Sequence, residues 1–205
     1  MSGMILHEYA ASGNCYKIRL TAAHVGVPLE RRQYDIMKRE TRTPEFLANV
    51  NPNGRIPVLQ DGNKFLAESN AACFYLADGS DIVPNDRYDR ADMLHWMFWE
   101  QYNHEPNIAT LRFWKRWVGL DALSDAQRMQ MTGKREGGLA ALDLMDRHLE
   151  SHRWLAADRF TIADICLFAY THLADEADFD LEAYPAIVRW MESIMSLPQH
   201  ISLDA

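Results

Sequence analysis

The spacing of hydrophobic positions divides the chain into two parts near residue 80. In the first part, short apolar runs cover residues 4–8, 30–34, 56–60 and 63–66. Runs of this length predict strands. The last two runs flank an Asp-Gly dipeptide, which is typical of a tight β-hairpin turn.

Three further segments of the first part have the spacing of helices. Residues 13–26 carry apolar side chains at helical intervals and stop at a glycine. Residues 43–47 begin with a Thr-Pro pair that is typical of a helix start, and residues 68–77 offer another apolar face. The order βαβ followed by ββα predicts a compact α/β domain over residues 1–80.

Beyond residue 80 the pattern becomes helical. We expect residues 81–86 to form a linker and residues 87–205 to form an all-helical domain. Pro106 is expected to interrupt the first long helix, and Gly137 and Gly138 are expected to weaken the second. The predicted fold class is therefore α/β followed by all-α. The helices are predicted over residues 87–118, 124–152, 161–174 and 184–195.

The composition limits the classes of partner that this chain can bind and predicts its cellular compartment. The 205 residues are 48% hydrophobic and carry a formal charge of -8, which argues against nucleic acid or an anionic membrane surface as the main partner. The sequence lacks the pattern of a signal peptide and any apolar stretch of the roughly 18 residues that span a membrane. Cys15, Cys73 and Cys166 form no close pair, so we expect no disulfide framework, no metal site and a location in the reducing cytoplasm.

Ser12 stands where the first strand passes into the first helix. Backbone amides at a helix start carry positive potential, and a hydroxyl there can donate a hydrogen bond to an anion such as a thiolate. Cys15 is a rival nucleophile, because a helix start lowers thiol pKa values. The simpler interpretation is an ordinary N-cap at Ser12 and a small packed residue at Cys15.

Glu68 and Ser69 stand at the start of a later helix. The hydroxyl and amide of Ser69 could hold a ligand carboxylate, and Glu68 could face an ammonium group beside it. An amino-acid head group carries both charges on one carbon and would fit. A plain acidic cap is the simpler interpretation of these two residues alone.

Thr161 and Asp164 have the spacing of a capping box ahead of an apolar run. We interpret them as a device for stability and assign Asp164 no role in catalysis.

The order and spacing of these motifs resemble the cytosolic glutathione transferase superfamily. Ser12 lies fourteen residues before the glycine that ends its helix, Pro57 follows a turn over residues 51–54, and Glu68 lies eleven residues beyond Pro57. The resemblance covers essentially the whole chain. It implies a thioredoxin-like N-terminal domain, an all-helical C-terminal domain and a homodimer.

The resemblance also gives an account of Pro57, which cannot donate a hydrogen bond and so fits poorly inside a strand. It implies a cis bond between Ile56 and Pro57, which costs little more than a trans bond before proline. The Ile56 backbone would then pair with the cysteinyl part of glutathione. This would turn the start of the strand into a peptide-binding edge.

The resemblance further implies that Glu68 and Ser69 hold the γ-glutamyl head group. Arg42, fifteen residues before Pro57, matches a basic residue for the glycyl carboxylate, and Arg55 is another candidate.

The position of Ser12 is similar to that in the serine-using theta, delta and zeta kinds, with Cys15 and Tyr9 as rivals for control of the thiol. The resemblance implies conjugation of the glutathione thiolate to small electrophilic, apolar substrates, a detoxification reaction without a metal. The alternatives are a glutathione-dependent disulfide reductase, peroxidase or isomerase, and a non-catalytic glutathione-binding module. The aromatic residues are interpreted mainly as core, but those expected beside the second substrate are Tyr9, Tyr102, Phe113 and Trp117.

Overall fold

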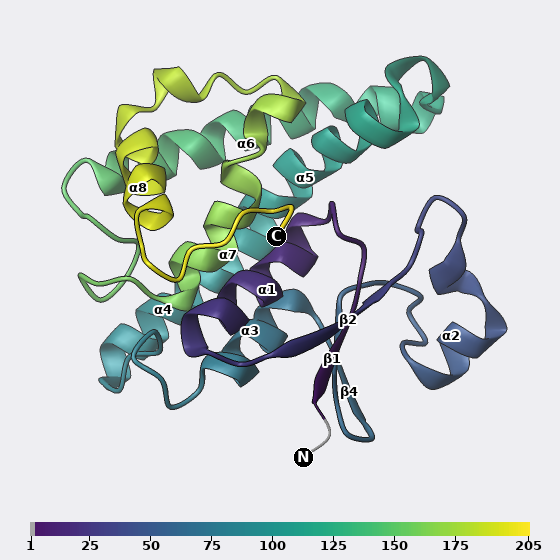
Figure 1. Ribbon diagram of the computed structural model, residues 1–205. Coiled ribbons are helices and arrows are strands. Elements are labelled where there is room, and N and C mark those ends of the chain that lie inside the picture. Colours follow the sequence, from purple (N-terminus) through teal and green to yellow (C-terminus); the bar gives the residue numbers. More distant parts are fainter. Residues whose placement is uncertain (1–2) are drawn as a thin grey trace. The chain divides into compact units, whose positions relative to one another are not determined.

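The computed structural model describes residues 3–205, which divide into two compact units (Figure 1). The first unit contains residues 3–83 together with 198–205, and the second contains residues 84–197. This differs from the predicted helical domain, which was to continue to residue 205. The difference arises because backbone carbonyls of the last segment accept hydrogen bonds from side chains of the first unit.

The first unit is built on a four-stranded mixed sheet with the strand order β2-β1-β3-β4. Strand β1 (Met4–Glu8) pairs in parallel with β2 (Leu29–Gln33) and antiparallel with β3 (Val58–Asp61). Strand β3 pairs with β4 (Lys64–Ala67), which confirms the predicted hairpin. The βαβ and ββα order confirms the thioredoxin-like fold class.

Three α-helices complete the first unit. Helices α1 (Gly13–Val25) and α3 (Ser69–Ala77) pack against each other, and α2 (Pro44–Asn49) precedes the hairpin. Helix α1 ends where Gly26 takes a left-handed φ of 70°, a conformation that glycine adopts without steric cost. The hydroxyl of Thr43 caps α2, as predicted.

The second unit contains no strand between residues 84 and 197, which confirms the all-helical prediction for this part of the chain. Helix α7 forms its centre, because every residue of this helix is buried. The five α-helices are α4 (Arg87–Trp99), α5 (Glu105–Phe113), α6 (Asp125–Leu149), α7 (Ile162–Thr171) and α8 (Pro185–Met195).

The first predicted long helix is interrupted near Pro106, as expected. Residues Glu100–His104 form a π-helical turn between α4 and α5, and Pro106 lies in the first turn of α5. Proline has no N–H to donate, so the hydrogen-bond ladder cannot continue unchanged through it. A second π-helical turn, Trp114–Val118, follows α5.

Helix α6 continues without a break through Gly137 and Gly138, the two residues expected to weaken it. A Cβ atom on Gly138 would lie 2.3 Å from Cζ of Phe179, and one on Gly137 would lie 2.7 Å from Nδ2 of Asn107. The two glycines therefore allow other parts of the second unit to approach the helix closely.

The predicted capping box opens α7. The Asp164 carboxylate accepts hydrogen bonds from the backbone N of Thr161 (2.8 Å), the backbone N of Leu155 (3.0 Å) and Nε1 of Trp190 (2.9 Å). Burial raises the pKa of Asp164 to about 6, while these donors act in the opposite direction. This confirms the predicted capping box, and the buried Asp164 carboxylate is enclosed by its hydrogen-bond donors.

Candidate functional site

Ser12 is the N-cap of α1 and follows β1 after a short loop. Its backbone is extended, with φ -79° and ψ 124°, and its Oγ accepts a long hydrogen bond of 3.4 Å from the backbone N of Cys15. No acidic residue lies in the first turn of α1. The positive end of the helix dipole at Ser12 is therefore not neutralised by a carboxylate from that turn.

Cys15 is fully buried one turn into α1. Its Sγ accepts a hydrogen bond from the backbone N of Tyr9 at 3.4 Å. Burial raises the pKa of the Cys15 thiol to about 12, so it stays protonated at neutral pH. This geometry favours a packing role for Cys15 and disfavours the alternative in which Cys15, and not Ser12, controls the chemistry.

Ser69 is brought to the start of α1 by the packing of α1 against α3. It is the first residue of α3, it is buried, and its Oγ donates a hydrogen bond to Oδ1 of Asn14 at 3.2 Å. Asn14 was not among the predicted site residues, although its place two residues after Ser12 in the same helix start could have indicated it. The two helix starts thus form one polar corner.

Glu68 has a strained backbone at this corner. It is exposed and has φ 71° and ψ 115°, a conformation that residues other than glycine rarely adopt. Strain of this kind typically costs about 1–3 kcal/mol and is concentrated at functional sites. The conformation places the acidic residue immediately before the first turn of α3.

The bond between Ile56 and Pro57 is cis, as predicted. The preceding turn is shaped by the buried Asn51, whose Oδ1 accepts from the backbone N of Asn53 (3.0 Å) and whose Nδ2 donates to the carbonyl of Arg55 (2.9 Å). Within residues 3–205, the Ile56 backbone makes no hydrogen bond. Its N–H and C=O are therefore available to an extended ligand.

Arg42 lies against the same turn. Its Nη1 donates to the carbonyl of Asn53 at 2.9 Å, and a Cβ atom on Gly54 would lie 2.7 Å from that nitrogen. The glycine, with φ 64°, therefore leaves room for the guanidinium group. This exposed cation lies beside the turn that leads to Pro57.

The residues expected beside the second substrate fall in both units. In the second unit, the rings of Phe113 and Trp117 stack with their centroids 6.0 Å apart. Tyr102 is 84% exposed, and Tyr9, in the first unit, is half-buried. The structure thus brings one pair of these four aromatic residues together.

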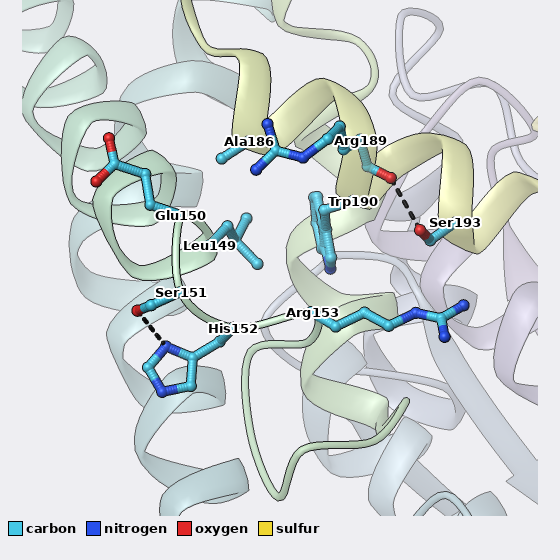
Figure 2. A pocket seen from close by; sticks show the side chains of 9 residues that line it. All are labelled: Leu149, Glu150, Ser151, His152, Arg153, Ala186, Arg189, Trp190 and Ser193. Carbon is cyan, nitrogen blue, oxygen red and sulfur yellow. Dashed lines mark hydrogen bonds between the residues drawn. The ribbon is translucent and has the colours of Figure 1, made fainter.

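A separate pocket of about 330 Å³ lies in the second unit, between the end of α6 and α8 (Figure 2). The side chains of Arg153 and Arg189 extend in opposite directions on either side of Trp190. None of the predicted site residues lines this pocket.

Neither a metal centre nor a membrane span is found in the part of the chain that the structure describes. Within residues 3–205, no group of three or more His, Cys, Asp and Glu side chains is arranged to hold a metal ion. The helices formed by these residues lack the length and apolar character needed to cross a membrane.

The chain is similar to known proteins over nearly its whole length. Models of the N-terminal and C-terminal domains of glutathione S-transferase match residues 3–78 and 125–198. The crystal structure of a glutathione S-transferase from Pseudomonas fluorescens is similar with a TM-score of 0.92 and 42% identity, covering 98% of this chain and 99% of that chain. Glutathione S-transferase 2 of Anopheles gambiae is 31% identical, over 90% of this chain and 87% of the relative. The disulfide-bond oxidoreductase YfcG of Escherichia coli is 27% identical, over 95% of this chain and 92% of the relative.

Proposed function

We propose that this chain, which belongs to the glutathione S-transferase family, binds glutathione in its first unit and conjugates the glutathione thiolate to small electrophilic, apolar substrates. The observation that carries the proposal is the polar corner formed by Ser12, Asn14 and Ser69. It combines two helix starts, which favour anions, with a hydroxyl donor at each.

Glutathione would lie along this corner as an extended peptide. The Ile56 backbone would pair with its cysteinyl residue, since it has no hydrogen bond within the described chain. Glu68 and Ser69 would hold the ammonium and carboxylate of the γ-glutamyl group. Arg42, a cation beside the same turn, would receive the glycyl carboxylate.

Ser12 would act by stabilising the thiolate. A free thiol has a pKa near 8.5, and each unit by which it is lowered corresponds to about 1.4 kcal/mol. The Ser12 hydroxyl would donate to the sulfur at the positive end of α1, and the thiol proton would pass to solvent. With an aryl halide, the thiolate would then form a C–S bond to the ring carbon, and the halide would depart with its bonding electrons. With an epoxide or an isothiocyanate, no group leaves: the ring C–O bond opens or the C=N bond takes up the electron pair, and the resulting anion gains a proton from solvent.

Ser12→Ala and Cys15→Ser test this assignment as a matched pair. A serine hydroxyl at position 15 can still accept from the backbone N of Tyr9, so it removes the thiol while preserving that contact. We expect Ser12→Ala to lower the rate of conjugation to an activated aryl halide by about 10- to 100-fold. Cys15→Ser should retain the rate within about threefold. The reverse pattern would contradict the role of Ser12 and indicate chemistry at Cys15.

A glutathione-dependent disulfide reductase is a second candidate, favoured by the similarity to the disulfide-bond oxidoreductase of Escherichia coli. In that reaction, the glutathione thiolate would attack a disulfide sulfur and release the other sulfur as a thiolate. Turnover of a model disulfide well above conjugation of aryl halides, isothiocyanates and epoxides would favour it. A failure of glutathione to bind in calorimetry at millimolar concentration would contradict both candidates.

We also propose a homodimer in a reducing cytoplasm. Helix α4 leaves Tyr88 and Phe98 largely exposed, at 78% and 71%, and we propose that a second copy of the chain covers them. No disulfide joins the three buried cysteines, which fits a reducing compartment. Sedimentation equilibrium should give twice the mass of one 23.6 kDa chain, and a monomer at micromolar concentration would contradict the dimer.

A further inference from the structure

Glu8, the last residue of β1, is fully buried and connects three side chains. Its Oε2 accepts from Nη1 of Arg19 at 2.7 Å, and its Oε1 accepts from Nε of Arg31 and from Nε2 of Gln33, the latter at 2.6 Å. A buried carboxylate requires such partners, because isolated charge in the interior is strongly unfavourable. The positions of these three side chains are therefore coupled through Glu8.

Two of these side chains also hold the loop that leads to Ser12. Nη2 of Arg19 donates to the carbonyl of Ala10 at 3.0 Å, and Oε1 of Gln33 accepts from the backbone N of Ala10 at 3.0 Å. Ala10 lies two residues before Ser12, and both its polar backbone groups are occupied by the Glu8 network. The backbone N of Ser12 in turn donates to the carbonyl of Tyr9 at 2.9 Å.

The segment 198–205 adds an outer layer to this network. Three of its carbonyls accept hydrogen bonds: Ile201 from the Tyr16 hydroxyl (2.6 Å), Leu203 from Nη2 of Arg19 (2.6 Å) and Ala205 from Nη1 of Arg31 (2.5 Å). Figure 1 shows this yellow segment ending beside the purple β1–α1 connection. One nitrogen of Arg19 thus contacts both the Ser12 loop and the C-terminal segment.

We propose that Glu8 and Arg19 are positioning residues for the Ser12 hydroxyl, and that the segment 198–205 clamps Arg19 in the orientation this requires. The inference rests on the proposed function of Ser12. A hydrogen bond to a thiolate depends steeply on donor position, and displacement by about 1 Å can cost a rate on the order of 100-fold. Loosening the clamp should therefore raise the thiol pKa without removing any group that touches glutathione.

Arg19→Lys tests the contacts that Arg19 makes with Glu8, Ala10 and Leu203. Lysine keeps the charge beside Glu8 but lacks the planar fork that reaches Ala10 and Leu203 together. The pH profile of kcat/KM for an aryl halide, measured at saturating glutathione, reports the thiol pKa of the enzyme–glutathione complex. We expect its midpoint to rise by about one unit, a tenfold loss of rate below the midpoint, with little change in the KM for glutathione.

Tyr16→Phe tests the contact between helix α1 and segment 198–205, and Tyr34→Phe is its matched control. The first variant removes the hydroxyl that donates to Ile201, and the second removes a hydroxyl that contacts His7 in the same sheet. Tyr16→Phe should raise the midpoint by a few tenths of a unit and speed amide hydrogen exchange in residues 9–15. Tyr34→Phe should leave the profile and this exchange unchanged.

A Ser12→Ala profile separates the two proposals. If Ser12→Ala does not move the midpoint, the proposed function of Ser12 fails. If it does, a folded Arg19→Lys with the wild-type midpoint, or a lower rate at an unchanged midpoint, overturns the clamp. If circular dichroism shows that Arg19→Lys does not fold, Tyr16→Phe is the deciding variant. A wild-type midpoint of its pH profile, together with wild-type hydrogen exchange in residues 9–15, would overturn the clamp.

Discussion

Helices α1 and α7 both begin with a hydroxyl N-cap, but the two helix starts differ in how fully their polar groups are occupied. At α7, Thr161 and Asp164 form a reciprocal capping box that is entirely buried. At α1, Ser12 is only half-buried, makes one long capping bond and has no acidic residue in the first turn. The start of α7 is closed by its own side chains, whereas the start of α1 retains positive potential for an anion.

The comparison shows that an N-cap motif does not by itself distinguish stability from function. What distinguishes them is whether an acidic side chain from the same turn already occupies the site. At α7, the residue three positions after the N-cap is the acidic Asp164. At α1, the residue three positions after Ser12 is the buried, uncharged Cys15. We therefore expect changes at α7 to affect mainly folding and changes at α1 to affect mainly the thiol.

The largest effect is expected from Asp164→Ala, which should lower the free energy of unfolding by about 3–5 kcal/mol. The change leaves buried donors of Leu155, Thr161 and Trp190 without their acceptor. Urea denaturation measures the loss. The control is Ser124→Ala, which removes the exposed capping box of α6 and should cost only about 1 kcal/mol. Equal losses in the two variants would contradict the enclosed role of Asp164.

Acid should destabilise the first unit through His24, in the last turn of α1. Burial, with a contribution from His200, lowers the pKa of His24 to about 4 from its ordinary value of 6.5. The unfolded chain then binds a proton that the folded chain excludes, so stability falls as pH drops through this window, by about 2 kcal/mol. Asp164 has the opposite sign, because its raised pKa adds stability as pH falls from about 6 to 3.8.

His24→Gln isolates this contribution. Urea denaturation at about pH 7.5 and about pH 4.5 should show a smaller loss on acidification in the variant than in the wild type. The same acid loss in both proteins would show that His24 does not titrate as described.

A smaller effect is expected from Asn14→Asp, which adds an acidic side chain to the first turn of α1. The new carboxylate would lie in the first turn and compete with a bound thiolate for the positive potential. The thiol pKa of the enzyme–glutathione complex should rise by about half a unit, which corresponds to about 0.7 kcal/mol. The pH profile of conjugation measures this shift. A lowered thiol pKa would mean that the helix start does not act on the sulfur as proposed.

The sequence predicted those features that depend on neighbouring residues. Gly26, Thr43 and the Thr161 capping box mark helix ends through local geometry, and Pro106 marks an interruption for the same reason. The two helix starts at Ser12 and Ser69 were predicted for the same reason, but their contact through Asn14 was not.

Features that depend on distant pairing could not be predicted. Glu8 and Arg19 look like ordinary surface charges in the sequence, yet both are buried because they pair with each other. Segment 198–205 lies where its carbonyls meet Tyr16, Arg19 and Arg31, which are far from it in the sequence. Gly138 likewise resembles a helix-weakening residue until the ring of Phe179 is seen against it.

The thiol pKa of bound glutathione tests the central claim most directly. The ultraviolet absorbance of the thiolate, titrated with pH in the complexes of wild type and Ser12→Ala, gives this value without a second substrate. We predict a thiol pKa at least about one unit below 8.5 in the wild type, and a return toward 8.5 in Ser12→Ala. Equal values in the two complexes would contradict the claim that the open start of α1 holds the sulfur anion.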